Sequence, residues 1–174
     1  MRRFLFLLLT LPLFVASTAL AAWGDFEFEF DSEKPWVELQ ARLPAYPKLD
    51  DALPFFVSSA TDNTFFIDPL SISVGEDNVV RYTLIVKSPE GALNITFEGV
   101  RCGTGEYKIY AFGHPDGQWS RNRYAKWSPI RYQDRNRQHH VLYDDFFCPG
   151  GLIAKDANEI IFALKRGIHP RAER

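Results

Sequence analysis

The residues best suited to chemistry lie between Gln118 and Phe147, where basic and aromatic side chains interleave. Cations beside aromatic rings can neutralise a polyanion and stack on it. We therefore predict that the segment 118–143 binds a protein or an anionic polymer, through Arg121, Arg123, Trp127, Arg131 and Arg135. A structural alternative stays open, in which the tryptophans pack on a sheet and the arginine stems lie on the surface with their charged heads in water.

Two adjacent histidines, His139 and His140, precede Asp144, Asp145 and Cys148, and these residue types could together bind a metal. A zinc site needs three or four converging ligands, whereas adjacent side chains of a strand point to opposite faces. We therefore predict no metal site, and no cofactor.

No catalytic residue is assigned from the sequence, because the nucleophile-elbow pattern of hydrolases is absent. His114 lies in a turn, and the adjacent carboxylates of Asp144 and Asp145 are expected to diverge. The alternative to a binding protein is a small hydrolase, in which His139 or His140 would meet Asp144 only in the folded chain.

The chain begins with a pattern typical of a secretory signal. Two arginines precede an apolar run, Phe4–Val15, which is followed by small residues up to Ala22. The simplest cut falls after Ala21, so residues 1–21 are predicted to be removed. The apolar run is shorter than the roughly 18 to 20 residues of a membrane-spanning helix, so no span is expected after cleavage.

Export by general secretion predicts a soluble protein that works outside the cytoplasm. The two candidate functions are a non-catalytic binding or accessory protein and a small hydrolase. The partner predicted for this compartment is an envelope protein or an anionic polymer, and not a cytoplasmic nucleic acid. The chain has 20 basic and 22 acidic residues, a formal charge of −2, and loss of two arginines with residues 1–21 leaves 18 and 22, or −4. A positive binding surface would therefore be local, and its binding sensitive to salt.

The chain has two cysteines, Cys102 and Cys148. An even count in an exported protein favours a disulfide. Closing a loop of this length would stabilise the fold by about 4 kcal/mol. The alternative, in which Cys148 is a nucleophile or a metal ligand, needs a free thiolate.

Turn residues recur at even intervals from residue 62 to residue 117, and the stretches between them alternate apolar and polar residues. The apolar side of each stretch is predicted to pack and the polar side to face water. We predict an α+β fold, with an antiparallel β-meander of about five to six strands covered by a C-terminal helix, and one disulfide. The residues expected to face water are Arg81, Thr83 and Lys87 in one strand and Asn94, Thr96 and Glu98 in the next.

The C-terminal helix has the clearest end signals: Asp156 as N-cap, Glu159 three residues later and Gly167 as the stop. A shorter helix is predicted from Pro35 to about Arg42, and the alternating Phe26–Phe30 stretch is typical of an edge strand. The predicted organisation is a signal peptide (1–21), an N-terminal extended or short-helix segment (22–54), a single globular β-rich domain (55–168) and a tail (169–174).

Four strings of residues resemble the cryptic neisserial protein family: Ser59–Phe66, Val80–Leu84, Glu98–Cys102 and Phe147–Pro149. They follow one another in order along most of the chain after the predicted signal. The resemblance implies a periplasmic protein of a double-membraned bacterium, with both cysteines in family positions. It implies no activity and no functional site.

Overall fold

The computed structural model describes residues 35–132 and 137–172. The chain divides into two units, Met1–Pro35 and Trp36–Arg174, and every element below belongs to the second. The predicted signal peptide (1–21), the predicted strand Phe26–Phe30 and the candidate binding residue Arg135 lie outside the described residues.

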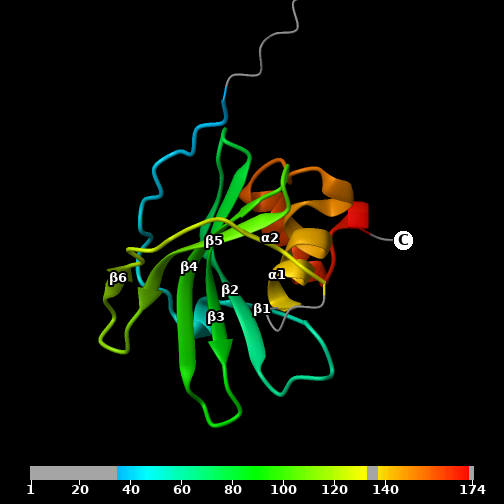
Figure 1. Cartoon of the computed structure of the whole chain (residues 1–174). Helices are drawn as coiled ribbons and strands as arrows, with labels where there is room; N and C mark the ends of the chain where they lie inside the picture. The colour runs from blue at the N-terminus through cyan, green and yellow to red at the C-terminus, as the bar shows by residue number, and fades with distance from the viewer. Residues whose placement is uncertain (1–34, 133–136, 173–174) are drawn as a thin grey trace, which may run out of the picture. The chain divides into compact units, whose positions relative to one another are not determined.

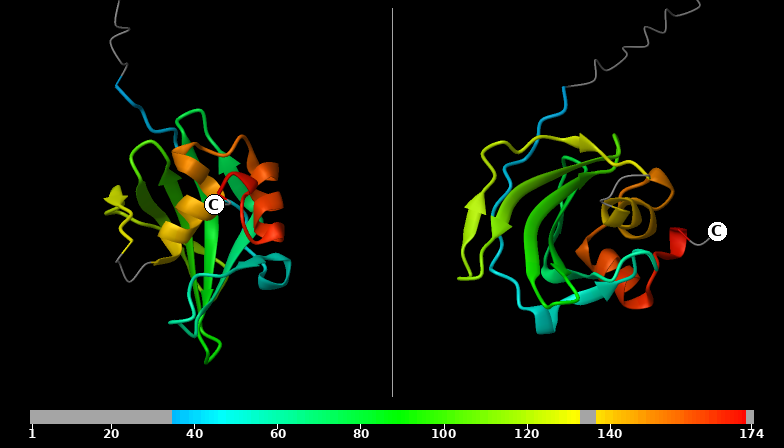
Figure 2. Two further views of the ribbon diagram at one scale, coloured as in Figure 1. Left: turned by 90° about the vertical axis from the view of Figure 1, so that its right-hand side faces the viewer. Right: turned by 60° about the horizontal axis from the view of Figure 1, so that its bottom comes forward.

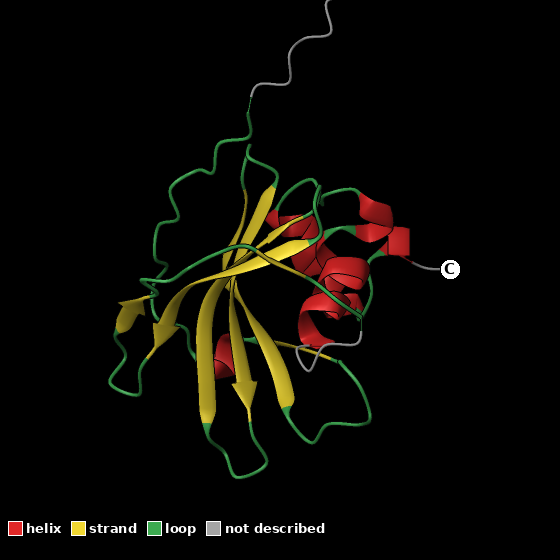
Figure 3. Ribbon diagram, viewed as in Figure 1, coloured by secondary structure: helices red, strands yellow, loops and turns green. Residues whose placement is uncertain are grey.

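In the part of the chain that the structure describes, seven antiparallel strands form one sheet (Figures 1 and 3). Six of them lie side by side in sequence order, and β7 pairs with β5. This order confirms the predicted β-meander. The strands are β1 (Leu53–Phe55), β2 (Thr64–Val74), β3 (Val79–Lys87), β4 (Leu93–Arg101), β5 (Glu106–Gly113), β6 (Trp119–Arg121) and β7 (Ser128–Pro129).

Glycines with positive φ shape two of the hairpin turns, Gly91 (φ 90°) between β3 and β4 and Gly117 (φ 81°) between β5 and β6. The amide of Gly91 donates to the Ser88 carbonyl at 2.9 Å, and that of Gly117 to the His114 carbonyl at 3.0 Å. Because side chains with a Cβ disfavour this region, both turns depend on glycine, and the even spacing of turn residues in the sequence reflects them.

A helical layer covers one face of the sheet. Its helix α2 (Ala157–Arg166) confirms the predicted C-terminal helix: the Asp156 carboxylate accepts from the Glu159 amide at 2.9 Å, and Gly167 ends the helix at φ 90°. Among residues 35–132 and 137–172, no helix is both long and apolar enough to cross a membrane. The other helical elements are α1 (Arg137–Val141), the π-helical segment η2 (Leu142–Phe147) and three 3-10 turns, η1 (Leu49–Asp51), η3 (Pro149–Gly151) and η4 (Pro170–Ala172).

The main core lies between the helical layer and the face of the sheet that curves around it (Figure 2). The ring of Tyr82 on β3 packs on Phe147 with centroids 4.8 Å apart, and Phe55 packs on Phe146 at 6.0 Å. Ile160 of α2 is fully buried in the same cluster. Each large apolar side chain buried in this way contributes roughly 1.5 to 3 kcal/mol, so this core holds the helices on the sheet.

The prediction that the polar sides of β3 and β4 face water is wrong for their central residues. Arg81 is 6% exposed and Glu98 2% exposed, and Thr83 and Thr96 are also buried. The reason is that both faces of the sheet are covered. Glu98 faces the helical layer, where it contacts His139, and Arg81 lies under an extended chain segment on the opposite face.

That segment, residues 36–48, is here called the N-terminal strap. The helix predicted from Pro35 to Arg42 is wrong, because residues 35–48 contain no helix. The amide of Leu39 donates to the Asp77 carboxylate at 2.8 Å, and its carbonyl accepts from the Arg81 guanidinium at 2.9 Å. Both backbone groups of Leu39 therefore bind side chains, those of Asp77 in the turn between β2 and β3 and of Arg81 in β3, and are not available for helical hydrogen bonds.

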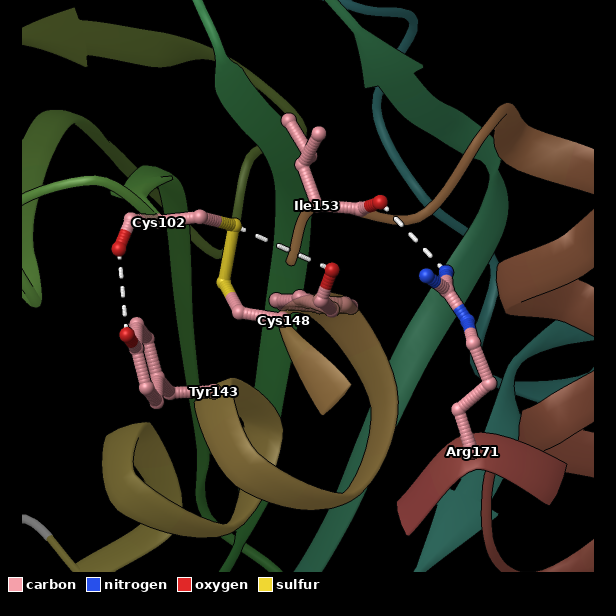
Figure 4. The surroundings of a disulfide bond; sticks show 6 residues. Cys102, Tyr143, Cys148, Ile153 and Arg171 are labelled. Carbon is pink, nitrogen blue, oxygen red and sulfur yellow. Dashed lines mark hydrogen bonds between the residues drawn. A yellow bond between two sulfur atoms is a disulfide. The ribbon is translucent and has the colours of Figure 1, made fainter. Parts of the chain in front are cut away.

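The Cys102–Cys148 disulfide is present, as predicted, and joins the end of β4 to the helical layer (Figure 4). Its Cα atoms are 5.5 Å apart and both cysteines are buried. Next to it, the Tyr143 hydroxyl donates to the Cys102 carbonyl at 3.0 Å. Cys148 therefore has no free thiolate, and the reading of it as a nucleophile or metal ligand is excluded.

Candidate functional site

The two tryptophans of the basic and aromatic segment are anchored to the protein. The Trp119 indole N–H donates to the Pro44 carbonyl of the strap at 3.1 Å, and its ring packs on Tyr46 with centroids 5.5 Å apart. The Trp127 indole N–H donates to Glu38 at 3.2 Å, and its ring meets Trp36 edge-on at 5.9 Å. Trp127, a candidate binding residue, is therefore half-buried and holds the segment on the strap.

The cations of the segment point the other way. Arg121, Arg123, Lys126 and Arg131 are exposed and make no hydrogen bond or ion pair with the described residues. Tyr124, among them, is 88% exposed. Arg121, Arg123 and Arg131 thus fit the predicted binding surface, which we call the basic track (residues 121–131).

The acid beneath the track, Glu38, is ionised and already paired with a cation. Glu38 accepts from the Lys108 ammonium at 2.8 Å and from the Trp127 indole. Partial burial alone would raise the pKa of Glu38, but the hydrogen bonds from Lys108 and Trp127 outweigh it and hold that pKa below its usual value. Glu38 therefore does not cancel the charge of the exposed arginines.

A cleft of about 400 Å³ opens in the helical layer where the basic segment ends. His140 and Asp144 lie one helical turn apart in its wall, with the His140 Nε2 atom 3.3 Å from the Asp144 Oδ2 atom. The Tyr132 ring meets His140 edge-on at 4.8 Å. The Arg137 guanidinium carbon lies 5.4 Å from the Tyr132 ring centre, while its Nη1 donates to the Ser58 hydroxyl at 3.2 Å.

A second cleft, of about 330 Å³, shares part of this wall. Asp144, Asp145 and Ala172 line both clefts, and the second adds Gly150, Gly151 and Arg171. The two carboxylates therefore stand between Arg137 on one side and Arg171 on the other.

His139 has a different role from its neighbour. It is 3% exposed, its Nε2 atom lies 2.7 Å from the Glu98 carboxylate, and its ring stacks on Tyr107 at 3.9 Å. The two histidines point in different directions, as expected, but the reason is a helix and not a strand. Both lie in α1, where successive residues point about 100° apart. His139 is therefore closed to a substrate, and only His140 of the predicted pair meets Asp144.

Glu98 is the buried charge at the centre of the helix and sheet interface. It accepts from the Tyr82 hydroxyl and from the Thr96 hydroxyl, each at 2.7 Å. Full burial would raise the pKa of Glu98, but the charge of His139 and the hydrogen bonds from His139, Thr96 and Tyr82 lower it below its usual value. Burial beside this carboxylate also raises the pKa of Tyr82 well above the usual value.

Sequence reasoning missed Glu98 as a structural centre. It falls on the polar side of an alternating strand, where the pattern predicts a solvent-exposed acid. The contact that buries it comes from His139, 41 residues away, and no local signal reports such a pairing.

The described side chains of the cleft are better suited to binding a ligand than to catalysing a reaction. Within the described residues, no group of three or more histidine, cysteine, aspartate or glutamate side chains is placed to hold a metal ion. The described residues that line the larger cleft include no serine, threonine or cysteine. The His140 and Asp144 pair resembles the base and orienting acid of a hydrolase, but no serine, threonine or cysteine nucleophile accompanies it among the described residues of the cleft wall.

Comparison with known proteins gives a family. A family model described as the CNP1-like family matches residues 31–165. The chain is also similar to cryptic neisserial protein 1 of Neisseria gonorrhoeae (strain ATCC 700825 / FA 1090), with 32% identity over 111 residues that cover 57% of this chain and 54% of the relative. The chain thus matches about half the length of that curated relative. No solved structure matches the chain.

Proposed function

The chain belongs to the CNP1-like family, and we propose that it is a soluble periplasmic protein that binds an anionic partner of the cell envelope without catalysing a reaction. The predicted signal over residues 1–21 supports export. The Cys102–Cys148 disulfide also favours an oxidising compartment.

The observation that carries the proposal is that the tryptophans and the arginines of the basic segment have different surroundings. Its tryptophans are fixed to the strap, while Arg121, Arg123 and Arg131 are exposed and unpaired among the described residues. Several unpaired cations held on an anchored segment of an acidic chain form a local positive surface for a negative partner.

Titration with two anionic polymers, poly-L-glutamate and polygalacturonate, tests this function. The purified exported protein is expected to bind at least one of them, with an affinity that falls as salt rises. The variant Arg121→Gln, Arg123→Gln, Arg131→Gln should bind at least about tenfold more weakly, since three exposed cations at roughly 0.5 kcal/mol each add up to about 1.5 kcal/mol.

The matched control is Arg42→Gln, Lys155→Gln, Lys165→Gln, which removes three exposed cations outside the track and changes the net charge equally. It should bind like the wild type. Equal weakening in both triple variants, or no binding of either polymer, would show that the basic track is not a binding surface.

The second candidate function is a small periplasmic hydrolase, and the 3.3 Å approach of His140 to Asp144 is the observation that favours it. In this reading His140 would accept a proton from an attacking water, with Asp144 orienting the imidazole. Turnover of p-nitrophenyl acetate or bis(p-nitrophenyl) phosphate that is lost in His140→Ala and kept in His114→Ala would establish it. Absence of turnover leaves the binding function as the better account.

A further inference from the structure

The basic track leads along the chain to the larger cleft, because its last cation, Arg131, directly precedes the cleft residue Tyr132. The described chain from β6 to Tyr132 crosses beside the sheet (Figure 1), and the Tyr132 ring contacts His140 of the helical layer. Arg131, the last described cation of the track, is exposed and directly precedes Tyr132, which lines the cleft. A polymer bound along the track therefore has a cleft at the end of its path.

The cleft offers both polar and apolar groups. Arg137 supplies a guanidinium whose Nη1 alone is used by Ser58, and Asp144 supplies carboxylate oxygens beyond its contact with His140. Tyr132 is 62% exposed, so much of its ring faces solvent. Val57 and Ile168 add apolar surface. A volume of about 400 Å³ lies within the range of small-ligand sites.

A sugar ring has the matching chemistry. Its hydroxyl groups both donate and accept, so neighbouring hydroxyls can bind a carboxylate and a guanidinium together, and its C–H face can pack on an aromatic ring and on aliphatic side chains. An anionic peptide offers Asp144 one backbone N–H donor per residue, whereas a sugar ring offers several neighbouring hydroxyl groups that both donate and accept. The acids in the cleft wall therefore favour a hydroxyl-rich ligand over a merely negative one.

We propose that the anionic partner is a glycan, of which one sugar ring sits in the cleft of Tyr132, Arg137, His140 and Asp144 while its negative substituents follow the basic track. This inference rests on the proposed binding function and names the partner of that same surface. The track supplies affinity through charge, and the cleft supplies the choice of sugar over polypeptide.

Isothermal titration with three polymers separates the two parts: polygalacturonate, which has both hydroxyls and charge, poly-L-glutamate, which has only charge, and dextran, which has only hydroxyls. We expect polygalacturonate to bind at least about tenfold more tightly than either of the others at the same salt concentration. Equal affinity for the two anionic polymers overturns the glycan assignment and leaves the proposed function standing. Binding of none of them overturns both.

Two cleft variants test where the choice is made. Tyr132→Ala and Asp144→Asn should each lower the preference for polygalacturonate over poly-L-glutamate by about tenfold, with little change in poly-L-glutamate affinity. The matched controls are Phe162→Ala, an aromatic residue of α2 that is 57% exposed and lies outside the track and the cleft, and Asp62→Asn, an exposed acid that also lies outside both. If the controls change the preference as much as the cleft variants do, the cleft is not the sugar site. Circular dichroism confirms that each variant is folded.

Discussion

At the scale of single residues, Glu98 shows how a charge is held inside this fold. It is 2% exposed, yet its carboxylate receives Tyr82, Thr96 and His139, so both of its oxygens have partners. Removing one member of a buried pair leaves the other uncompensated, which costs more than the pair itself contributes. Glu98 and His139 are therefore expected to act as a unit that positions α1 on β4.

The variant Glu98→Gln should lower the free energy of unfolding at pH 7 by about 3 kcal/mol, because a neutral amide replaces the buried carboxylate that Tyr82, Thr96 and His139 contact. Urea unfolding followed by tryptophan fluorescence measures the loss. Glu90→Gln is the matched control, since Glu90 lies on the exposed turn between β3 and β4. It should unfold close to the wild type, and a similar loss in both variants would contradict the role given to Glu98.

The same residue predicts a dependence on pH. The pKa of Glu98 is lowered in the folded protein from its ordinary value of 4.5. The stabilisation from its ionised form is therefore complete above about pH 4.5 to 5 and is lost as the pH falls through the lower folded pKa. The stability gap between wild type and Glu98→Gln should narrow from pH 7 to pH 3, and a constant gap would show that the carboxylate charge is not what stabilises the fold.

At the scale of elements, the N-terminal strap is held by side chains and not by a strand or helix of its own. Arg81 and Asp77 form a buried ion pair at 2.6 Å, and both also bind the backbone of Leu39. The Arg81 guanidinium and the Leu39 amide hold the pKa of Asp77 below its usual value, although burial opposes them. One ion pair thus closes the turn between β2 and β3 and fastens the strap.

The variant Asp77→Asn should release the strap, because a neutral amide leaves the buried Arg81 charge uncompensated, at a cost of about 3 to 5 kcal/mol. Trypsin should then cleave faster after Arg42 and Lys48, which are exposed in the strap. Mass spectrometry of short digests measures the cut sites. Asp62→Asn serves as the control, and unchanged cleavage in Asp77→Asn would show that other contacts are enough to hold the strap.

At the scale of the whole molecule, the features that the sequence predicts correctly are those determined by residues close together in the chain. Asp156 and Gly167 marked α2 because a helix cap and a helix stop act within a few residues. The meander followed from turn residues, since antiparallel neighbours joined by short turns need little information from elsewhere. The strap was mispredicted because Leu39 binds Asp77 and Arg81, about 40 residues away, and these bonds override a weak local preference for helix.

The candidate site shows the same difference between features set by neighbouring residues and features set by distant contacts. Composition alone predicts Arg121, Arg123 and Arg131 as binding residues, and the structure shows that all three are exposed. His140 and Asp144 approach each other because this region is helical, which places residues four apart on one side. From the sequence, the two histidines are treated as part of a strand, so this helix is not predicted. Tyr132 and Arg137 are visible in the sequence as residue types, but only the fold brings them together with Val57 in one cleft wall and places Arg137 against Ser58, almost 80 residues away.

The disulfide ties the whole molecule together, because it joins the sheet to the helical layer across 46 residues of sequence. The double variant Cys102→Ala, Cys148→Ala should lose about 4 kcal/mol of unfolding free energy, since its unfolded chain regains the freedom of a loop of that length. Thiol titration of the unreduced, denatured wild type is expected to find no free thiol in the exported protein. The same chain made in the cytoplasm without residues 1–21 should show two thiols and unfold at a urea concentration near that of the double variant, because a reducing compartment keeps the bridge open. Two free thiols in the exported protein would contradict both the bridge and the proposed oxidising location.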